Sequence, residues 1–256
     1  MNTKIFKKYV LIFLIITSSG CKSQQNVLNQ DDVYPVDSLR TNKICFHRNM
    51  SSVDSSFYPQ IIKSIKQGID TTSRIIDLKD VEFRVLVFPS KTIPRIGMSG
   101  AAPNDKHIYI LLNPAHPKFD EAINTHIIQT IPHEYHHTLR YRTVGYGNNL
   151  FESMISEGLA CHFAIDVCKI DTPFYCQALT EEQFKEWQTK AEKIWFNPDY
   201  DHLEWFVGLK KTIPANTGYT IGFSLVSDYL KNHPGETAAS LYKTPADSFL
   251  VKKINQ

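Results

Sequence analysis

Five residues near the middle of the chain, His133-Glu134-Tyr135-His136-His137, constrain its fold and chemistry more than any other segment. Side chains four positions apart lie on one face of an α-helix, so His133 and His137 can present two imidazoles to one metal ion. Glu134 lies one step round the helix, close enough to reach a water molecule on that metal. Two imidazole ligands and a carboxylate base are the parts of a zinc hydrolase. The segment therefore predicts a helix, a zinc site and a general base.

The residues around this motif predict a helix with one buried face. Apolar side chains recur at every fourth position and form one stripe: Phe119, Ile123, Ile127, Ile131, Tyr135 and Leu139. Two residues on a helix are a rotation of about 200°, so the histidine pair faces away from Ile131 and the stripe. Pro132 cannot donate a backbone hydrogen bond, so we expect a kink or a new helical start just before His133.

The next segment, residues 150–167, is apolar on most sides and predicts a second helix. Glu152 and Glu157 on this helix are the two candidates for a third metal ligand. They lie about 140° apart round a helix, so they cannot face one ion equally. Glu152 falls in the first turn, where an acid favours the helix dipole without any other role. Glu157 precedes Gly158 and further small residues, which permit a close helix approach, so we prefer Glu157.

The remaining patterns predict an α+β protein with a small N-terminal mixed sheet and a mainly helical C-terminal lobe. We expect strands over residues 43–48, 81–88 and 107–112, and helices over residues 58–78, 180–195, 219–230 and 241–254. The glycine-rich segment 97–102 is either an ordinary loop or an edge strand that accepts an extended peptide by strand addition.

The first twenty residues indicate a secretory signal and not part of the fold. Basic residues precede the apolar run Tyr9–Ile16, which is too short to cross a bilayer as a helix. The Ser-Ser-Gly-Cys sequence ending at Cys21 resembles a bacterial lipobox, in which the cysteine is acylated; the alternative is an ordinary signal peptide with an unrelated cysteine. Acylation of Cys21 would anchor the chain without spanning the membrane. We therefore expect a lipoprotein of the bacterial cell envelope, exposed in the periplasm or at the cell surface.

Residues 21–41 then comprise the acylated cysteine and a flexible tether, because so polar a segment buries too little apolar surface to offset the entropy of ordering. Residues 42–256 form one globular domain. Without residues 1–20 the chain has 25 Lys and Arg against 26 Asp and Glu, with no basic cluster. This balance argues against a nucleic-acid partner, and we expect a monomer.

Export would place the remaining cysteines in an oxidising compartment: Cys45, Cys161, Cys168 and Cys176. Three pairings are possible, and the sequence does not choose among them. Cys161 and Cys168 are separated by about 10 Å of rise on one helix, which is too far for a bridge. Cys168 with Cys176 is the easier pair, and free buried thiols are the alternative.

The sequences of the two motif helices resemble those of known peptidases. His133 to His137, followed after nineteen intervening residues by Glu157 in Ser-Glu-Gly-Leu-Ala, is similar to the gluzincin branch of zinc peptidases. The resemblance is closer to the predicted zinc-dependent protease family with YjaZ-like members, long catalogued as a domain of unknown function. That family has His-Glu-Tyr-x-His, Ser-Glu-Gly-Leu-Ala and Gly-Tyr-x-Ile-Gly, and the last motif is here Gly218–Gly222. The resemblance covers about residues 105–245.

This resemblance implies a zincin-like fold, a Zn²⁺ cofactor and metallopeptidase activity on a protein or peptide substrate. The implied metal ligands are His133, His137 and Glu157. Glu134 would be the general base, and Tyr219 would donate to the oxyanion, with a core tyrosine as the alternative. Some gluzincins carry an acid four residues after the glutamate ligand, where this chain has Cys161. Hydrogen-bond partners that orient the metal ligands must therefore come from other residues.

Other ligands and other functions stay open at this point. His136 could replace His137 through i, i+3 spacing, and His126 lies on nearly the same face but fits a helix-surface histidine better. One rival function is a non-catalytic lipoprotein binding module whose motif helix is structural. Another is a zinc hydrolase of non-peptide amide bonds in the cell envelope. Metal analysis separates the first rival, and a substrate screen separates the second.

Overall fold

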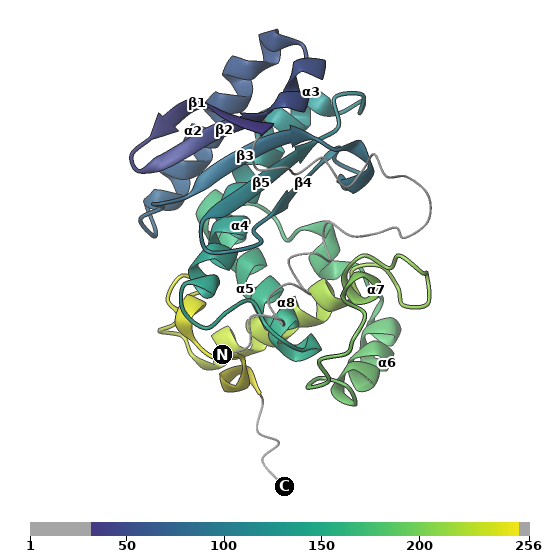
Figure 1. Ribbon diagram of the computed structural model, residues 1–256. Helices are drawn as coiled ribbons and strands as arrows, with labels where there is room; N and C mark the ends of the chain where they lie inside the picture. The colour runs from purple at the N-terminus through teal and green to yellow at the C-terminus, as the bar shows by residue number, and fades with distance from the viewer. Residues whose placement is uncertain (1–31, 251–256) are drawn as a thin grey trace, which may run out of the picture. The chain divides into compact units, whose positions relative to one another are not determined.

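The computed structural model describes residues 32–250 (Figure 1). The signal segment, Cys21 and the part of the predicted tether before residue 32 lie outside the described residues. The chain divides into two compact units, with the division between Thr138 and Leu139. Within residues 32–250, no helix is both long and apolar enough to cross a bilayer.

The first unit contains a five-stranded mixed sheet with the order β1-β2-β3-β5-β4. Its strands are β1 (Val33–Leu39), β2 (Asn42–His47), β3 (Glu82–Val87), β4 (Met98–Ala101) and β5 (His107–Leu112). The central strands β2, β3 and β5 are parallel, and the edge strands β1 and β4 are antiparallel to their neighbours. The predicted mixed α+β class is confirmed, and the three strands predicted from the sequence are β2, β3 and β5.

Both edge strands add to what the sequence predicted. The flexible tether was predicted to reach residue 41, which is wrong for Val33–Leu39, because these residues pair with β2 as β1. The polar composition that suggested a tether ends at Asp32, and the following residues can satisfy their backbone groups in a hairpin. Of the two expectations for residues 97–102, the structure shows the edge strand, β4.

One face of the sheet is apolar and carries the core of the first unit. Residues in register across β2, β3 and β5 are fully buried on this face: Ile44, Phe46, Phe83, Val85, Ile108 and Ile110. Helix α2 (Tyr58–Ser73) lies against the sheet (Figure 1). It ends five residues before the predicted boundary. At Gly68 an added Cβ would lie 2.5 Å from Ile131 Cδ1, so α2 and the motif helix pack closely.

The histidine motif lies on helix α4 (Ile127–Tyr141), which follows α3 (Phe119–Glu121) and a π-helical segment at Ala122–His126. Of the predicted kink or new helical start before His133, the new start is wrong, since α4 continues through Pro132. The apolar stripe explains this continuity. Its members from Phe119 to Leu139 are all buried, and their packing offsets the loss of one backbone hydrogen bond at the proline.

The described residues of the second unit form helices and loops and no strand. Its helices are α5 (Leu150–Cys168), α6 (Glu181–Glu192), α7 (His202–Phe206) and α8 (Thr217–Asn232). Thr180 forms the predicted capping box at the start of α6. The helix predicted over residues 241–254 is wrong: short 3₁₀ turns occur at Leu241–Lys243 and Ala246–Phe249, and residues 251–254 lie outside the described part. Pro245 separates the two turns, because a proline disfavours helical geometry at the residue before it.

Two glycines set the spacing of α5 and α8. A Cβ on Gly158 would collide with the carbonyl oxygen of Gly222, and a Cβ on Gly222 would collide with the carbonyl oxygen of Met154. The predicted packing role of Gly158 is therefore real, and it serves contact with α8. The backbones of the two helices therefore lie close together at these positions.

All four cysteines of the described residues are free thiols: Cys45, Cys161, Cys168 and Cys176. The pairing of Cys168 with Cys176 that seemed easiest from the sequence is not formed. Burial raises the pKa of the Cys168 thiol to about 11, so it is protonated and unreactive at neutral pH.

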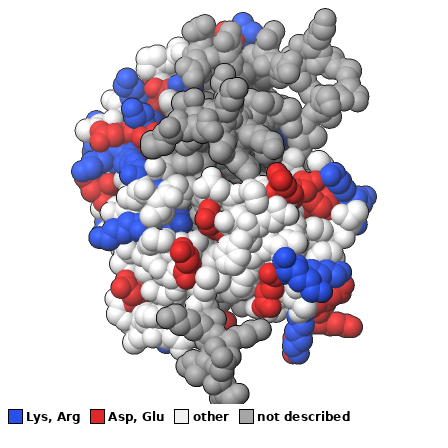
Figure 2. Space-filling model, turned by 60° about the horizontal axis from the view of Figure 1, so that its bottom comes forward, with Lys and Arg blue, Asp and Glu red and all other residues white. Residues whose placement is uncertain are grey.

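Charged side chains on the surface are mixed in sign. On the face shown in Figure 2, described Lys and Arg residues lie among Asp and Glu residues. On α6, Lys185 pairs with Glu181 and Lys190 pairs with Glu186. Such exposed pairs contribute little to stability, and they favour solubility.

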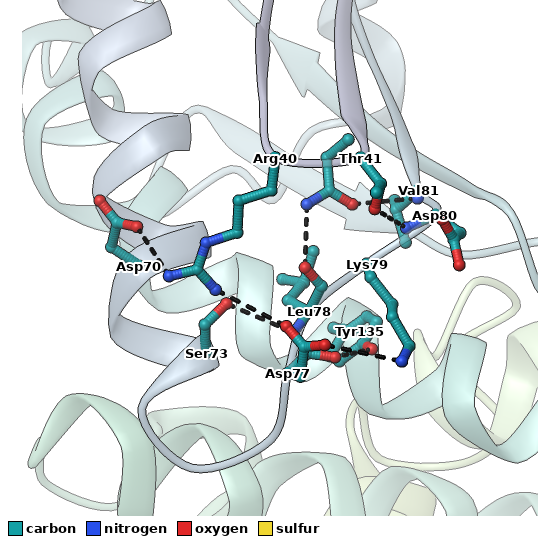
Figure 3. Close-up of polar contacts among 11 residues, drawn as sticks. Arg40, Thr41, Asp70, Ser73, Asp77, Leu78, Lys79, Asp80, Val81 and Tyr135 are labelled. Carbon is teal, nitrogen blue, oxygen red and sulfur yellow. Dashed lines mark hydrogen bonds and ion pairs between the residues drawn. The ribbon is translucent and has the colours of Figure 1, made fainter.

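The segment between α2 and β3 fastens the motif helix within the first unit (Figure 3). The Tyr135 hydroxyl of α4 donates to the carbonyl oxygen of Asp77 at 2.8 Å. The Asn42 side chain donates to the Leu78 carbonyl oxygen and accepts from the Val81 amide. Ion pairs of Asp77 with Arg40 and Lys79 surround these bonds, but their side chains are 45 to 63% exposed, so the hydrogen bonds matter more.

Replacing Tyr135 with Phe should lower the free energy of unfolding by about 1 kcal/mol, because it leaves a carbonyl oxygen without its donor. Urea unfolding followed by circular dichroism measures this change. Lys79→Ala is the control and should cost no more than about 0.5 kcal/mol. A larger loss for Lys79→Ala than for Tyr135→Phe would show that the ion pairs, and not the tyrosine bond, fasten the helix.

Candidate metal centre

Helix α4 brings two imidazole nitrogens together. The Nε2 atoms of His133 and His137 are 3.2 Å apart, and the two rings are nearly perpendicular at 85°. Both side chains are buried. Two nitrogen ligands of one tetrahedral zinc ion, at bond lengths of about 2.0–2.1 Å, are themselves about 3.3 Å apart. The histidine pair therefore has the spacing that two ligands of one zinc ion require.

The Glu134 carboxylate lies against the edge strand of the sheet. A Cβ added to Gly100 of β4 would lie only 2.5 Å from Glu134 Oε1 and would also meet the side chain of Thr130. Glycine at position 100 therefore makes room for the carboxylate. Glu134 itself is 6% exposed, so this contact fixes a buried acid beside a strand whose outer edge has no partner strand among the described residues.

The second unit positions Glu157 on α5. This carboxylate is buried, and its Oε1 accepts a hydrogen bond from the Tyr146 hydroxyl at 2.5 Å. Glu152, the competing carboxylate, lies in the first turn of α5, where its Oε2 accepts from the Asn148 amide at 2.5 Å. Glu152 thus closes the loop before the helix, as a first-turn acid does.

Among residues 32–250, a single group of His, Cys, Asp and Glu side chains has the spacing to hold a metal ion: His133, His137 and Glu157. Their ligand atoms all lie within 4.8 Å of one another. The group contains neither His126 nor His136 nor Glu152. Two imidazoles and one carboxylate are a donor set that fits zinc and leaves a coordination position for substrate or water.

A family model described as "Predicted Zn-dependent protease (DUF2268)" matches residues 61–251, about three quarters of the chain. The chain belongs to this family. The match begins at Ile61 in α2 and so includes most of the sheet as well as the motif helices. No curated protein matches the chain. The family predicted from the motifs is confirmed, and the zinc dependence in its description agrees with the His, His and Glu donor set.

Tyr219 lies in the first turn of α8, within an aromatic cluster of the second unit. Its ring meets those of Tyr175 and Phe206 edge-on, with centroids 5.1 and 5.2 Å away. Its phenol is close enough to raise the pKa of Tyr146. Tyr219 is thus half-buried and lies near Tyr146, which bonds Glu157. Its role in catalysis stays a prediction.

Tyr146 is the member of this region that the sequence did not predict. It lies in the loop between α4 and α5, flanked by Gly145 and Gly147, both of which have positive φ (+87° and +143°). Burial raises its pKa well above the ordinary value, and the charge of Glu157 acts in the same direction, so the phenol stays a neutral donor. An aromatic residue between two glycines just before the ligand helix is the sequence signal that could have indicated it.

A third buried carboxylate, Glu204 of α7, organises the loop that leads into α8. It accepts hydrogen bonds from the backbone amides of Lys210, Thr212 and Ile213 and from the Thr212 hydroxyl. Burial alone would raise the pKa of Glu204, but these donors outweigh it and lower the pKa to about 2. The ionised carboxylate therefore holds residues 210–213 in place ahead of Tyr219.

Glu204→Gln should lower the melting temperature at neutral pH, because an amide cannot accept all of these bonds. A folded-state pKa below the ordinary 4.5 stabilises the fold above that value, and this stabilisation is lost as the pH falls towards about 2. The difference in melting temperature between wild type and variant should therefore be large at neutral pH and should decrease towards pH 2. Glu192→Gln, at an exposed position on α6, is the control. A difference that is constant with pH would contradict this role of the ionised carboxylate.

Proposed function

We propose that this chain is a zinc-dependent metallopeptidase in which His133, His137 and Glu157 hold the metal. The observation that carries the proposal is the grouping of these three buried side chains, two nitrogens and one carboxylate, within ligand distance of one another. Membership of the predicted zinc-dependent protease family supports the same chemistry. We infer a gluzincin-type site, since the third ligand is a glutamate on the helix that follows the histidine motif.

Zinc held by these residues would polarise the scissile carbonyl and lower the pKa of the attacking water. Glu134 is one residue from His133, and its carboxylate is fixed beside Gly100. It would take the proton of the water and pass it to the leaving amine. The phenol of Tyr219 would donate a hydrogen bond to the oxyanion of the tetrahedral intermediate.

Strand β4 supports a peptide as the substrate. It is an edge of the described sheet and pairs only with β5, so its outer backbone groups can bind an extended chain by strand addition. Gly100 lies in this strand and contacts Glu134, so a peptide bound along β4 would pass beside the general base. This arrangement favours peptide bonds over the alternative of non-peptide amides in the cell envelope, and a substrate screen decides between them.

The cellular setting is also part of the proposal. The Ser-Ser-Gly-Cys sequence supports acylation of Cys21, which would hold a zincin-like catalytic domain at a membrane of the bacterial envelope and outside the cytoplasm. Proteins or peptides of that compartment would be its substrates, with the chain acting as a monomer. Mass spectrometry of the protein purified from membranes tests the lipid on Cys21.

Glu134→Gln should abolish peptide cleavage, a loss of roughly 10²-fold or more, while zinc content stays near that of wild type. Glutamine keeps the shape of the side chain and removes the base. Peptide-library digestion and metal analysis of the same preparations measure the two quantities. Glu152→Gln, an equivalent change on α5, is the control. Retention of most activity by Glu134→Gln would exclude Glu134 as the base.

Glu157→Ala should remove or greatly weaken zinc binding, whereas Glu152→Ala should leave it near normal. The reason is that Glu157 belongs to the metal-binding group and Glu152 bonds the Asn148 amide. Competition with a chromogenic chelator gives the zinc affinity of each variant. The reverse pattern would transfer the third ligand to Glu152. Absence of zinc binding in the wild type would instead favour the non-catalytic binding module.

A further inference from the structure

Tyr146 is held in place by two ring contacts. The ring stacks on Tyr141, with centroids 6.2 Å apart and planes 19° from parallel, and it meets His202 at 6.0 Å. Gly147 is needed beside it, since a Cβ there would lie 2.7 Å from Glu152 Cβ at a φ of +143°. The loop thus turns in a way that only glycine permits easily, and the tyrosine side chain is directed inward.

The backbone of Tyr146 is fastened to the residue that precedes Glu157. The Ser156 hydroxyl donates a short hydrogen bond to the Tyr146 carbonyl oxygen. Ser156 in turn accepts from Arg140 Nε at 2.9 Å. The same guanidinium donates to the carbonyl oxygens of Tyr242 and Thr244, at 3.3 and 3.2 Å. Arg140 is fully buried, and burial lowers its pKa only to about 10, so this anchor is charged at neutral pH.

Tyr146 therefore contacts Glu157 through its hydroxyl while Ser156 holds its carbonyl. The two ends of one residue bind two successive residues of α5, Ser156 and Glu157. A glutamate side chain has three rotatable bonds, and a buried one is costly to leave without a donor. One well-placed hydrogen bond can therefore decide which orientation of the carboxylate is populated.

We propose that Tyr146 is a positioning residue of the metal site, whose phenol holds the Glu157 carboxylate in the orientation that binds the metal. The inference rests on the proposed function, because it assigns Glu157 as a ligand. Partners that orient metal ligands typically contribute 10- to 100-fold in metal affinity. Here the partner is a phenol from the loop before α5, bonded to the glutamate itself.

The test is the zinc affinity of the purified full chain, measured by chelator competition. Tyr146→Phe should bind zinc roughly 10- to 100-fold more weakly than wild type. Tyr200→Phe is the matched control, because that phenol bonds Ser153 and His202 in the same unit, and it should bind zinc normally. In a Glu157→Ala background, Tyr146→Phe should cause no further loss, because its effect passes through that carboxylate.

A purely structural role of Tyr146 predicts a different result. In that case Tyr146→Phe would lower the melting temperature of the metal-free protein and leave the zinc dissociation constant unchanged, and this result would overturn the inference. Cobalt substitution gives a second readout: the visible spectrum of the Co²⁺ form should change in Tyr146→Phe and not in Tyr200→Phe. If Tyr146→Phe does not fold, Ser156→Ala keeps the phenol and removes its anchor, and should weaken zinc binding in the same direction.

The outcomes separate this inference from the proposed function. Zinc binding by wild type with equal affinity in Tyr146→Phe and Ser156→Ala overturns the inference alone. Failure of wild type to bind zinc overturns both. Additive losses in the Glu157→Ala background would mean that Tyr146 acts on the metal by another route, which also contradicts the inference.

Discussion

The separation of 3.2 Å between two imidazole nitrogens on one helix face is the constraint on which the site depends. It requires that α4 stay helical from one histidine to the other, directly after a proline. The side of α4 away from the histidines supplies the energy for this. Ile131 packs into the space that Gly68 leaves on α2, and the Tyr135 hydroxyl bonds the segment after that helix. The metal-binding face is thus maintained by the packing of the opposite face.

Three buried carboxylates show how the fold controls charge. Glu134 occupies the space left by the missing side chain at Gly100. Glu157 accepts a hydrogen bond from the Tyr146 hydroxyl, and Glu204 accepts from three backbone amides and a hydroxyl. Buried acids are costly unless they are hydrogen-bonded or bind a cation. For Glu204 the loop itself satisfies the charge. For Glu157 the Tyr146 phenol donates a hydrogen bond and, in our proposal, a metal ion binds the carboxylate.

Much of this architecture was predictable from the sequence because it depends on short-range periodicity. Spacing of four residues predicted the buried stripe of α4, alternation predicted β3, and the sequence motifs predicted the family. The new helical start predicted at Pro132 was wrong, because burial of the apolar stripe overcomes the local cost of the proline and a local rule does not include that burial. β1 was missed because its partner strand, and not its own composition, makes it ordered.

Tyr146 was missed for a different reason. Its importance comes from a loop conformation set by positive φ at Gly145 and Gly147 and from bonds to Ser156 and Glu157. Sequence spacing carries no information on which way a loop side chain points. The Glu157 ligand itself could be preferred from its neighbours, but the group that orients it became visible only in three dimensions.

Zinc K-edge X-ray absorption on the purified protein, combined with metal analysis, tests the central claim most directly. We predict close to one zinc ion per chain, with only nitrogen and oxygen neighbours at about 2.0–2.1 Å and the outer-shell scattering of imidazole. Sulfur neighbours at about 2.3 Å would assign the metal to cysteines instead. Either that result or the absence of tightly bound zinc after metal loading would contradict a site made by His133, His137 and Glu157.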